Sequence, residues 1–75
     1  MSRKVTVSMQ IILNGEAKTV TLGLSVGGLL ETLGIESRKV AVERNLEIVP
    51  KSAFAATVLT EGDRLEIVHF IGGGV

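Results

Sequence analysis

The sequence predicts an α+β fold in which one main helix packs on one face of a mixed sheet of four to five strands. Three observations carry this prediction: an Asn14-Gly15 pair between two strand-like runs, an apolar stripe at helical spacing after Ser25, and an alternating run from Arg64 to Phe70. One helix cannot cover both faces of a sheet, so the second face is expected to meet solvent. The 75 residues show no internal repeat and are expected to form a single domain.

The first element is a β-hairpin. An apolar run from Gln10 to Leu13 precedes Asn14-Gly15, the pair that a type I′ turn favours because both central residues need positive φ. The return strand, residues 17–22, alternates Thr19 and Thr21 with Val20 and Leu22, which predicts one wet and one dry face. Residues 1–8 are either a lengthening of the first strand or a loose N-terminal extension.

The helix begins after Ser25, whose side chain can accept a hydrogen bond from a free N–H of the first turn. Its apolar stripe follows the i, i+3, i+4, i+7 spacing of one buried face: Val26, Leu29, Leu30 and Leu33. Gly27 and Gly28 each cost a helix about 1 kcal/mol relative to alanine, so the stripe must stabilise it. Gly34 lies where a left-handed residue ends a helix.

The second half of the chain predicts a third strand, a short edge segment and a final strand. The third strand covers residues 40–44, and a turn from Asn45 to Ile48 leads into an edge segment that Pro50 stops. Residues 51–59 are expected to be irregular or a single helical turn, anchored by Phe54, Val58 and Leu59. Residues 61–63 form a turn. In the final strand, core-directed Leu65 and Ile67 alternate with Glu66 and Val68.

Joining the first and last strands as parallel neighbours at the centre of the sheet gives the β-grasp arrangement. The chain end then leaves directly from a central strand. That end, residues 71–75, contains three consecutive glycines before Val75. Glycine loses the most entropy on ordering, so this tail is expected to be flexible and slender. Such a tail can thread into a narrow cleft of another protein and present its carboxylate there.

Composition excludes several functional classes. Eight basic and eight acidic residues balance, and there is no Trp or Tyr, whereas nucleic-acid binding calls for a basic stripe and, for single strands, aromatic platforms. The absence of cysteine rules out disulfides, thiolate metal sites and a cysteine nucleophile. No apolar run approaches a membrane span or a signal peptide, so a soluble, cytoplasmic protein is expected.

We expect no catalytic residue, no metal site and no bound cofactor in this chain. His69 is the single histidine, without a nearby nucleophile, and is expected to be a surface residue beside the tail. The carboxylates of Glu61, Asp63 and Glu66 are better explained by a turn that Asp63 caps than by a catalytic pair.

The order of elements resembles the ubiquitin-like sulfur-carrier proteins, in particular the family of the thiamine pathway (ThiS). The matching stretches span residues 9–74: Leu13–Glu16 at the hairpin, Val40–Asn45 leading to Ile48–Pro50, Leu59–Asp63, and Gly73-Gly74. The resemblance implies a β-grasp domain that is a protein co-substrate and not an enzyme. A ubiquitin-activating-type adenylyltransferase would use ATP to adenylate the terminal glycine carboxylate. A sulfur donor such as a cysteine desulfurase would supply the sulfur, and the resulting thiocarboxylate would deliver it to thiazole synthase.

The resemblance places the reactive carboxyl on Gly74, with Gly72 and Gly73 giving reach inside the partner's active site. Val75 departs from the family's usual glycine end. Three explanations stand: proteolytic removal of Val75, a remnant of expression, or a partner that tolerates it. If two residues are trimmed, the reactive residue becomes Gly73. Counting from Asp63 favours Gly74.

Three other functions remain open at the level of sequence. The small subunit of molybdopterin synthase uses the same thiocarboxylate chemistry, but it commonly approaches its end through a proline-containing segment that residues 68–71 lack. A ubiquitin-like modifier would be conjugated to lysines, and a plain binding module would make no use of the tail.

A docking surface is expected on the open face of the sheet. Val68 and Phe70 lie on the side of the last strand opposite its core-directed residues, and Ile12 on a neighbouring strand points the same way. Apolar residues gathered on an open sheet face suggest a partner-binding patch.

Overall fold

A computed structural model of the chain describes residues 7–70, and it forms a mixed five-stranded sheet with one α-helix. Strands β1 (Ser8–Leu13) and β2 (Glu16–Thr21) form the first hairpin. Strands β3 (Val40–Arg44) and β4 (Glu47–Val49) form a second hairpin, and β5 (Arg64–His69) is the last strand. The order across the sheet is β2-β1-β5-β3-β4, with β1 and β5 parallel. The predicted β-grasp arrangement is therefore confirmed.

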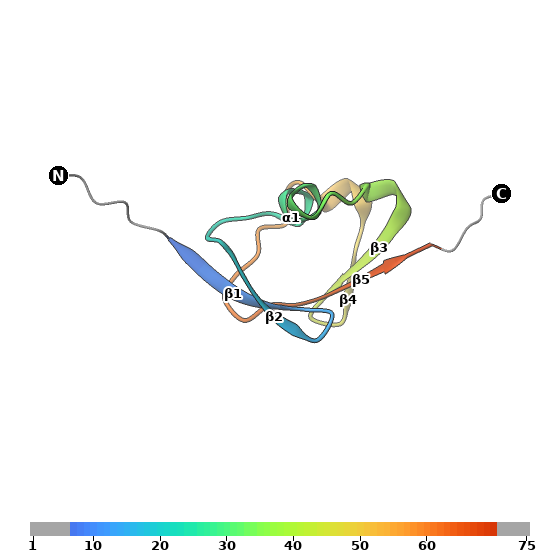
Figure 1. Cartoon of the computed structure of the whole chain (residues 1–75). Helices are drawn as coiled ribbons and strands as arrows, with labels where there is room; N and C mark the ends of the chain where they lie inside the picture. The colour runs from blue at the N-terminus through green and yellow to red at the C-terminus, as the bar shows by residue number, and fades with distance from the viewer. Residues whose placement is uncertain (1–6, 71–75) are drawn as a thin grey trace.

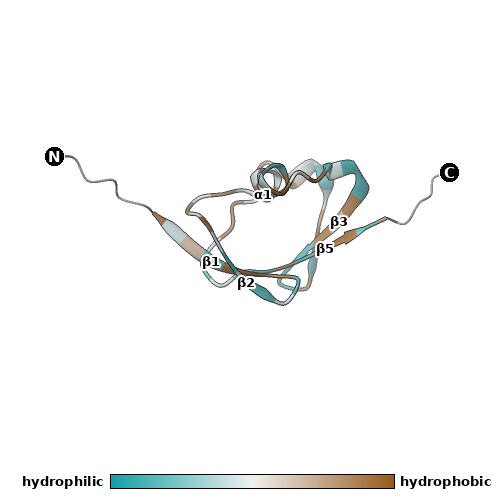
Figure 2. Ribbon diagram, in the orientation of Figure 1, coloured by the Kyte–Doolittle hydropathy of each residue, from teal (hydrophilic) through white to brown (hydrophobic). Residues whose placement is uncertain are grey.

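Helix α1 (Val26–Leu33) and two short 3₁₀ segments, η1 (Ser37–Lys39) and η2 (Lys51–Ala53), lie together over one face of the sheet (Figure 1). The core fills the space between this layer and the sheet. Its fully buried side chains come from the helix and from the three central strands, together with one loop residue: Ile11, Val26, Leu29, Leu30, Val40, Val42, Leu59 and Leu65. Hydrophobic colour follows β1, β3 and β5, whereas hydrophilic residues gather at the turns (Figure 2).

The first hairpin has the turn that its sequence predicts. Asn14 and Gly15 have φ values of 49° and 85°, and Leu13 pairs with Glu16 across them. The first strand begins at Ser8, so the last residue of the predicted N-terminal stretch lengthens it. Leu22 differs from the prediction: it is 53% exposed and not on the dry face. The strand ends at Thr21 and Gly23 turns the chain toward the helix at a φ of 87°, so the alternation stops there.

The start of α1 depends on a close approach of the chain at residues 53–57. The N–H of Val26 donates to the carbonyl of Thr57, and the N–H of Gly27 donates to that of Phe54, each at 2.9 Å. The Ser25 hydroxyl accepts the N–H of Gly28, as predicted. A Cβ at position 27 would lie 3.5 Å from the Phe54 carbonyl oxygen. Backbone bonds from this segment therefore hold the first turn, which offsets the low helix propensity of its two glycines.

The end of α1 also follows the prediction. Gly34 has a φ of 72°, and its N–H bonds to the carbonyl of Glu31 while that of Ile35 bonds to Leu30. This pair of bonds satisfies carbonyls that the last turn leaves free.

Residues 51–59 contain one short helical turn, the second of the two forms expected, but only two of the three predicted anchors are buried. Phe54 and Leu59 are 5% and 1% exposed, whereas Val58 is 51% exposed. Val58 forms an isolated bridge with Ser25, so the backbone is extended there. Side chains alternate along an extended chain, and because Leu59 points inward Val58 must point outward.

Candidate functional site

The candidate site is the end of β5, because the glycine-rich residues follow it in the sequence. Strand β5 pairs with β3 from Leu65, opposite Arg44, to its last residue His69, opposite Val40. With β1 it pairs only at its first two residues, where Ile12 and Leu13 are the partners. The last residues of β5 therefore project past the end of β1, with a strand on one side only.

The side chain of Asn14 takes the place of the missing strand. Its backbone N–H donates to the carbonyl of Leu65 at 2.8 Å. Its amide oxygen accepts the N–H of Ile67 at 2.8 Å, and its amide nitrogen donates to the Ile67 carbonyl at 3.3 Å. Sequence reasoning assigned Asn14 only to the turn. The available signal was the choice of asparagine, since glycine satisfies the same turn but offers no such bonds.

On the other side, two lysines hold Phe70, the last residue that the structure describes. The N–H of Phe70 donates to the carbonyl of Lys39 at 2.9 Å. The ammonium of Lys51 donates to the carbonyl of Val40 at 3.0 Å and lies 5.0 Å from the centre of the Phe70 ring. An ammonium at this distance over an aromatic face is attracted to it. Neither lysine was predicted, because both contacts join segments distant in sequence.

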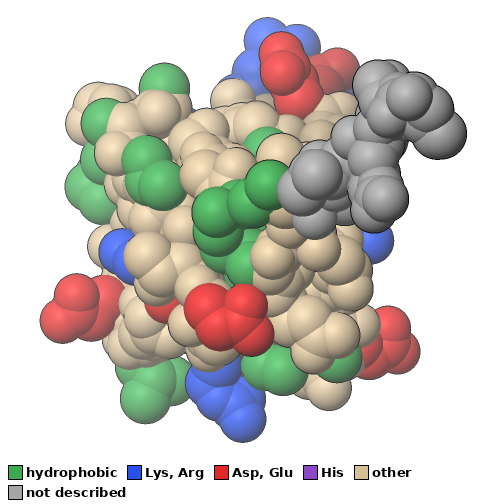
Figure 3. Space-filling model, turned by 90° about the vertical axis from the view of Figure 1, so that its left-hand side faces the viewer, with side chains coloured by type: hydrophobic (Ala, Val, Ile, Leu, Met, Phe, Trp, Pro, Cys, Tyr) green, Lys and Arg blue, Asp and Glu red, His purple; other side chains and the backbone are tan. Residues whose placement is uncertain are grey.

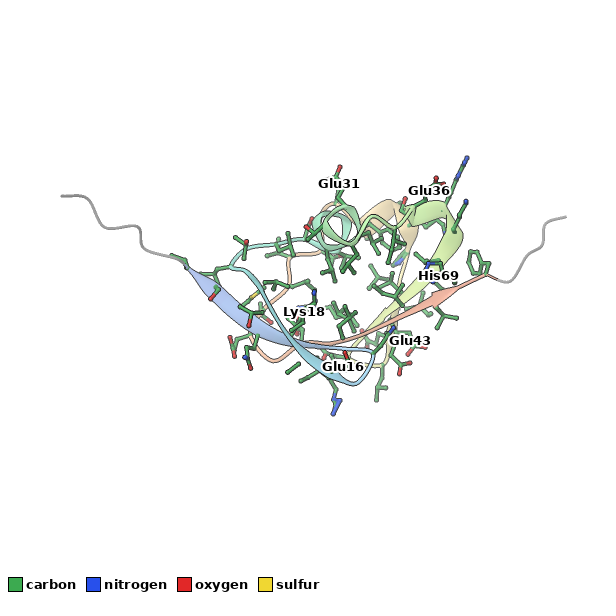
Figure 4. The ribbon with its side chains drawn as sticks, in the orientation of Figure 1. Glu16, Lys18, Glu31, Glu36, Glu43 and His69 are labelled. Carbon is green, nitrogen blue, oxygen red and sulfur yellow. The ribbon has the colours of Figure 1, made fainter. Side chains whose placement is uncertain are left out.

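His69 is exposed at the end of β5, on the side where this strand projects (Figure 4). Glu31 and Glu36 lie on the outer surface of the helical layer and point away from it (Figure 4). Among residues 7–70, no group of three histidine, aspartate or glutamate side chains is placed to hold a metal ion.

The three predicted docking residues do not form one continuous patch, although Ile12 and Val68 lie on strand positions that alternate with core-directed ones. Val68 and Phe70 are each 58% exposed, and Ile12 is partly buried. Ile12 lies beside Arg64, four positions before Val68 on β5, which is about 13 Å along a strand. Glu66 occupies the alternate position of β5 between them. Val68 and Phe70 stand next to the chain end, and the docking role of all three stays a prediction.

The beginning of β5 is anchored by a buried carboxylate. Asp63 is 5% exposed. It accepts hydrogen bonds from Arg44 Nε at 2.9 Å, from Asn45 Nδ2 at 3.0 Å and from the Thr60 N–H at 2.8 Å. Burial by itself would raise the pKa of Asp63, but the bonds from Asn45, Thr60 and Arg44, with the charge of Arg44, outweigh it and lower that pKa. The predicted turn capped by Asp63 is confirmed.

Glu61 has a similar structural task, since its carboxylate accepts the N–H of Gln10 at 3.0 Å. The carboxylates of Glu61 and Asp63 therefore bind neighbouring backbone and side-chain donors, which is a structural task.

The predicted site residues Gly72, Gly73 and Gly74, and Val75 after them, lie outside the described residues. Elsewhere, the face on which β1 begins carries hydrophobic side chains in small groups set among backbone and other side chains, with a few charged ones around them (Figure 3). This face offers no broad apolar surface, which leaves the end of β5 as the best-supported site. In the described part of the chain, no helix has the length and apolar character needed to cross a membrane.

Parallel β1 and β5 at the centre of the sheet, a single helix across one face, and a glycine-rich end that follows β5 define the ubiquitin-like β-grasp class. Within that class, the chain belongs to the ThiS family, whose sequence pattern matches residues 11–74.

Individual relatives agree with this assignment. The chain is similar to the sulfur carrier protein ThiS of Escherichia coli, at 33% identity over 88% of this chain and 100% of that protein. The crystal structure of the thiamine biosynthesis protein ThiS from Geobacter metallireducens matches with a TM-score of 0.77 and 38% identity, covering 88% of this chain and 100% of the other.

A second group of relatives is longer. A thiazole synthase of Paramagnetospirillum magneticum is 56% identical over 66 residues, which cover 88% of this chain and 20% of that protein. The thiazole synthase of Magnetococcus marinus matches at 50% identity, also over 20% of its length. The chain thus spans about a fifth of the length of these relatives.

Proposed function

We propose that this chain is a sulfur carrier for thiazole formation in thiamine biosynthesis, with the carboxyl group of Gly74 as the point of attachment. The observation that carries the proposal is that a central strand of a ThiS-family domain, β5, leads directly into the glycine-rich end of the chain. Asn14 and Lys39 fix the two edges of that strand. The folded body would present the acyl group, and the glycines would carry it into a partner.

The chemistry needs an activated carboxyl group, because a carboxylate is a poor acyl donor. A ubiquitin-activating-type enzyme would join the Gly74 carboxylate to the α-phosphate of ATP and release pyrophosphate. Sulfur from a persulfide donor would then replace AMP, and a thiol reductant would release the thiocarboxylate. The chain contributes the acyl group and acts as a co-substrate, while its partners supply catalysis and bind the ATP.

Glycine at the reacting end has a physical purpose. A side chain next to the carbonyl would collide with the walls of a narrow active site, and Gly73 and Gly74 carry none. A valine at position 75 would add a β-branched side chain at this point, so the proposed reactive form is a chain that ends at Gly74.

The long relatives support thiazole synthase as the acceptor of the sulfur. A stretch similar to this chain occurs within proteins named thiazole synthase. A carrier and the enzyme that consumes its cargo gain effective concentration when they are joined in one chain. We propose that the same two activities meet here through docking.

The test is reconstitution followed by intact-mass measurement. The chain ending at Gly74 is incubated with a ThiS-adenylating enzyme, ATP and a persulfide donor, and the expected product is heavier by about 16 Da, sulfur replacing oxygen. A matched chain lacking residues 72–75 should show no gain. The chain ending at Val75 should react much more slowly than the chain ending at Gly74. Branched lysine conjugates in place of the mass gain would indicate a modifier and would contradict the proposal.

A further inference from the structure

The backbone of β5 presents alternate residues to its two sides. The Arg64 carbonyl accepts the N–H of Asn45, and the Phe70 N–H donates to the carbonyl of Lys39, so both residues bond toward the β3 side. Those of Leu65 and Ile67 bond toward the β1 side, where Asn14 receives them. Since the alternation has period two, the N–H and carbonyl of His69 point toward the β1 side.

Nothing in the described part of the chain pairs with His69 on that side. Strand β1 ends at Leu13, and the turn at Asn14 leads away to β2 on the far side of β1. The pairing of His69 with Val40 falls between the hydrogen-bonded positions of β3 and β5, so it uses neither group. His69 is also exposed. The result is a short open strand edge that begins where Asn14 stops.

We propose that this edge receives an extended segment of thiazole synthase by β-strand addition, with His69 as the first pairing residue. The inference rests on the proposed function and names how the acceptor enzyme grips the carrier. A strand added here would continue the ladder that Asn14 ends and would lie beside the end of β5, from which the chain leads into its glycine-rich residues. It would therefore guide the acyl end toward the active site.

Two features of the chain indicate that this open edge pairs with a partner strand and is not simply exposed to solvent. Proteins blunt an open edge by keeping it short or with a proline or a bulge; this edge is short, but residues 66–70 contain no proline and no bulge interrupts the pairing of residues 65–69 with β3. Val68 and Phe70, each 58% exposed, also flank His69 in sequence. Strand addition takes affinity from main-chain bonds and specificity from alternate side chains, and this segment offers both.

The experiment distinguishes the contribution of the His69 backbone N–H to binding from that of its side chain. His69→Pro removes the N–H and places the proline ring on the open edge, without removing a bond to β3. His69→Thr changes the side chain but keeps the N–H. Binding of the chain ending at Gly74 to thiazole synthase is measured by calorimetry. We expect His69→Pro to weaken binding at least about tenfold and His69→Thr less than about threefold.

Equal weakening by both variants would assign the effect to the imidazole and overturn the proposal. Binding of His69→Pro as tight as the parent's would overturn it also. Because a proline variant can be misfolded, amide hydrogen exchange of the parent gives a second measure. The His69 amide should exchange fast in the free chain and slowly with thiazole synthase, while the Val68 amide, which faces β3, should change little.

An unchanged His69 amide in the complex would overturn the proposal even if the proline variant fails to fold. Protection by the adenylating enzyme alone would overturn the choice of occupant. Failure of the proposed function looks different: the parent would then gain no sulfur in the reconstituted reaction, whatever the behaviour of its position-69 variants.

Discussion

At the scale of single residues, Asp63 joins the second hairpin to the turn that precedes β5. Its carboxylate holds Arg44 and Asn45 from the second hairpin and Thr60 from the preceding turn. Asn45 in turn accepts the N–H of Arg64 at 2.9 Å. A buried carboxylate with several donors is stabilising only while all partners remain, because each donor would otherwise be left unsatisfied.

Replacing Asp63 should therefore be costly. We expect Asp63→Ala to lower the free energy of unfolding by about 2–4 kcal/mol, since Arg44, Asn45 and Thr60 lose a common acceptor. The pKa of Asp63 is lowered in the folded state. Its contribution to stability is thus complete above the unfolded pKa and is lost as pH falls through the lower folded pKa.

Urea unfolding of the parent and of Asp63→Asn, followed from about pH 5 to about pH 2, measures this contribution. The parent should lose more stability with acid than the variant, so that the two curves converge. Parallel curves would show that Asp63 is not the group responsible.

At the scale of elements, α1 illustrates a conflict between propensity and packing. Gly27 and Gly28 both disfavour a helix, but they differ in their surroundings. A Cβ at position 27 would make ordinary contacts of 3.5–3.6 Å with Phe54 and Ala55, whereas one at position 28 would lie 2.8 Å from Leu24 Cδ1 and 3.3 Å from the Ser25 hydroxyl that caps the helix.

The two alanine variants should consequently behave differently. Gly27→Ala is expected to raise the free energy of unfolding by about 0.5–1 kcal/mol, the usual gain in helix propensity. Gly28→Ala should gain less or destabilise the fold, because Leu24 must move and the Ser25 cap is crowded. Thermal unfolding of both variants in the same buffer checks the order. A larger gain for Gly28→Ala would mean that Leu24 repacks freely.

The two hairpins show how far the sequence predicts local structure. The Asn14-Gly15 turn was predictable because glycine at positive φ carries a clear signal. The turn of the second hairpin has the same shape, with φ values of 52° at Asn45 and 73° at Leu46. Leucine rarely adopts a positive φ, so the sequence gives no signal for it. The hydrogen-bond partners of Asn45, which are Asp63 and Arg64, are 18 and 19 residues further along the chain. Sequence therefore predicted a turn there but not its type.

At the scale of the whole molecule, strand alternation predicted the buried face of the strands, with Leu22 as an exception, and the order of strands followed from the fold. The register of β1 against β5 followed neither from the alternation nor from the order of the strands. That register separates Ile12 from Val68 and leaves β5 projecting past β1. It is set by contacts between distant segments, such as Asn14 with Ile67, which no local pattern in the sequence reveals. The positions of Lys39 and Lys51 escaped prediction for the same reason.

Docking at the end of β5 should be separable from stability of the fold. Phe70→Asp removes an exposed ring whose contact with Lys51 is worth about 0.5–1 kcal/mol, so thermal stability should stay close to that of the parent. Binding to thiazole synthase should fall about tenfold or more, because exposed aromatic residues commonly anchor interfaces. Calorimetric titration gives the affinity and thermal unfolding gives the stability.

Leu46→Asp is the matched control for Phe70→Asp. Leu46 is 88% exposed, and it lies in the turn beside Arg64, at the opposite end of β3 from the segment that holds Phe70. If the docking surface is the end of β5, this variant should bind as the parent does. Equal losses in both variants would place the surface across the whole open face, where Ile12 also lies. Unchanged binding of Phe70→Asp would remove Phe70 from the interface and leave the backbone edge at His69 to hold the partner.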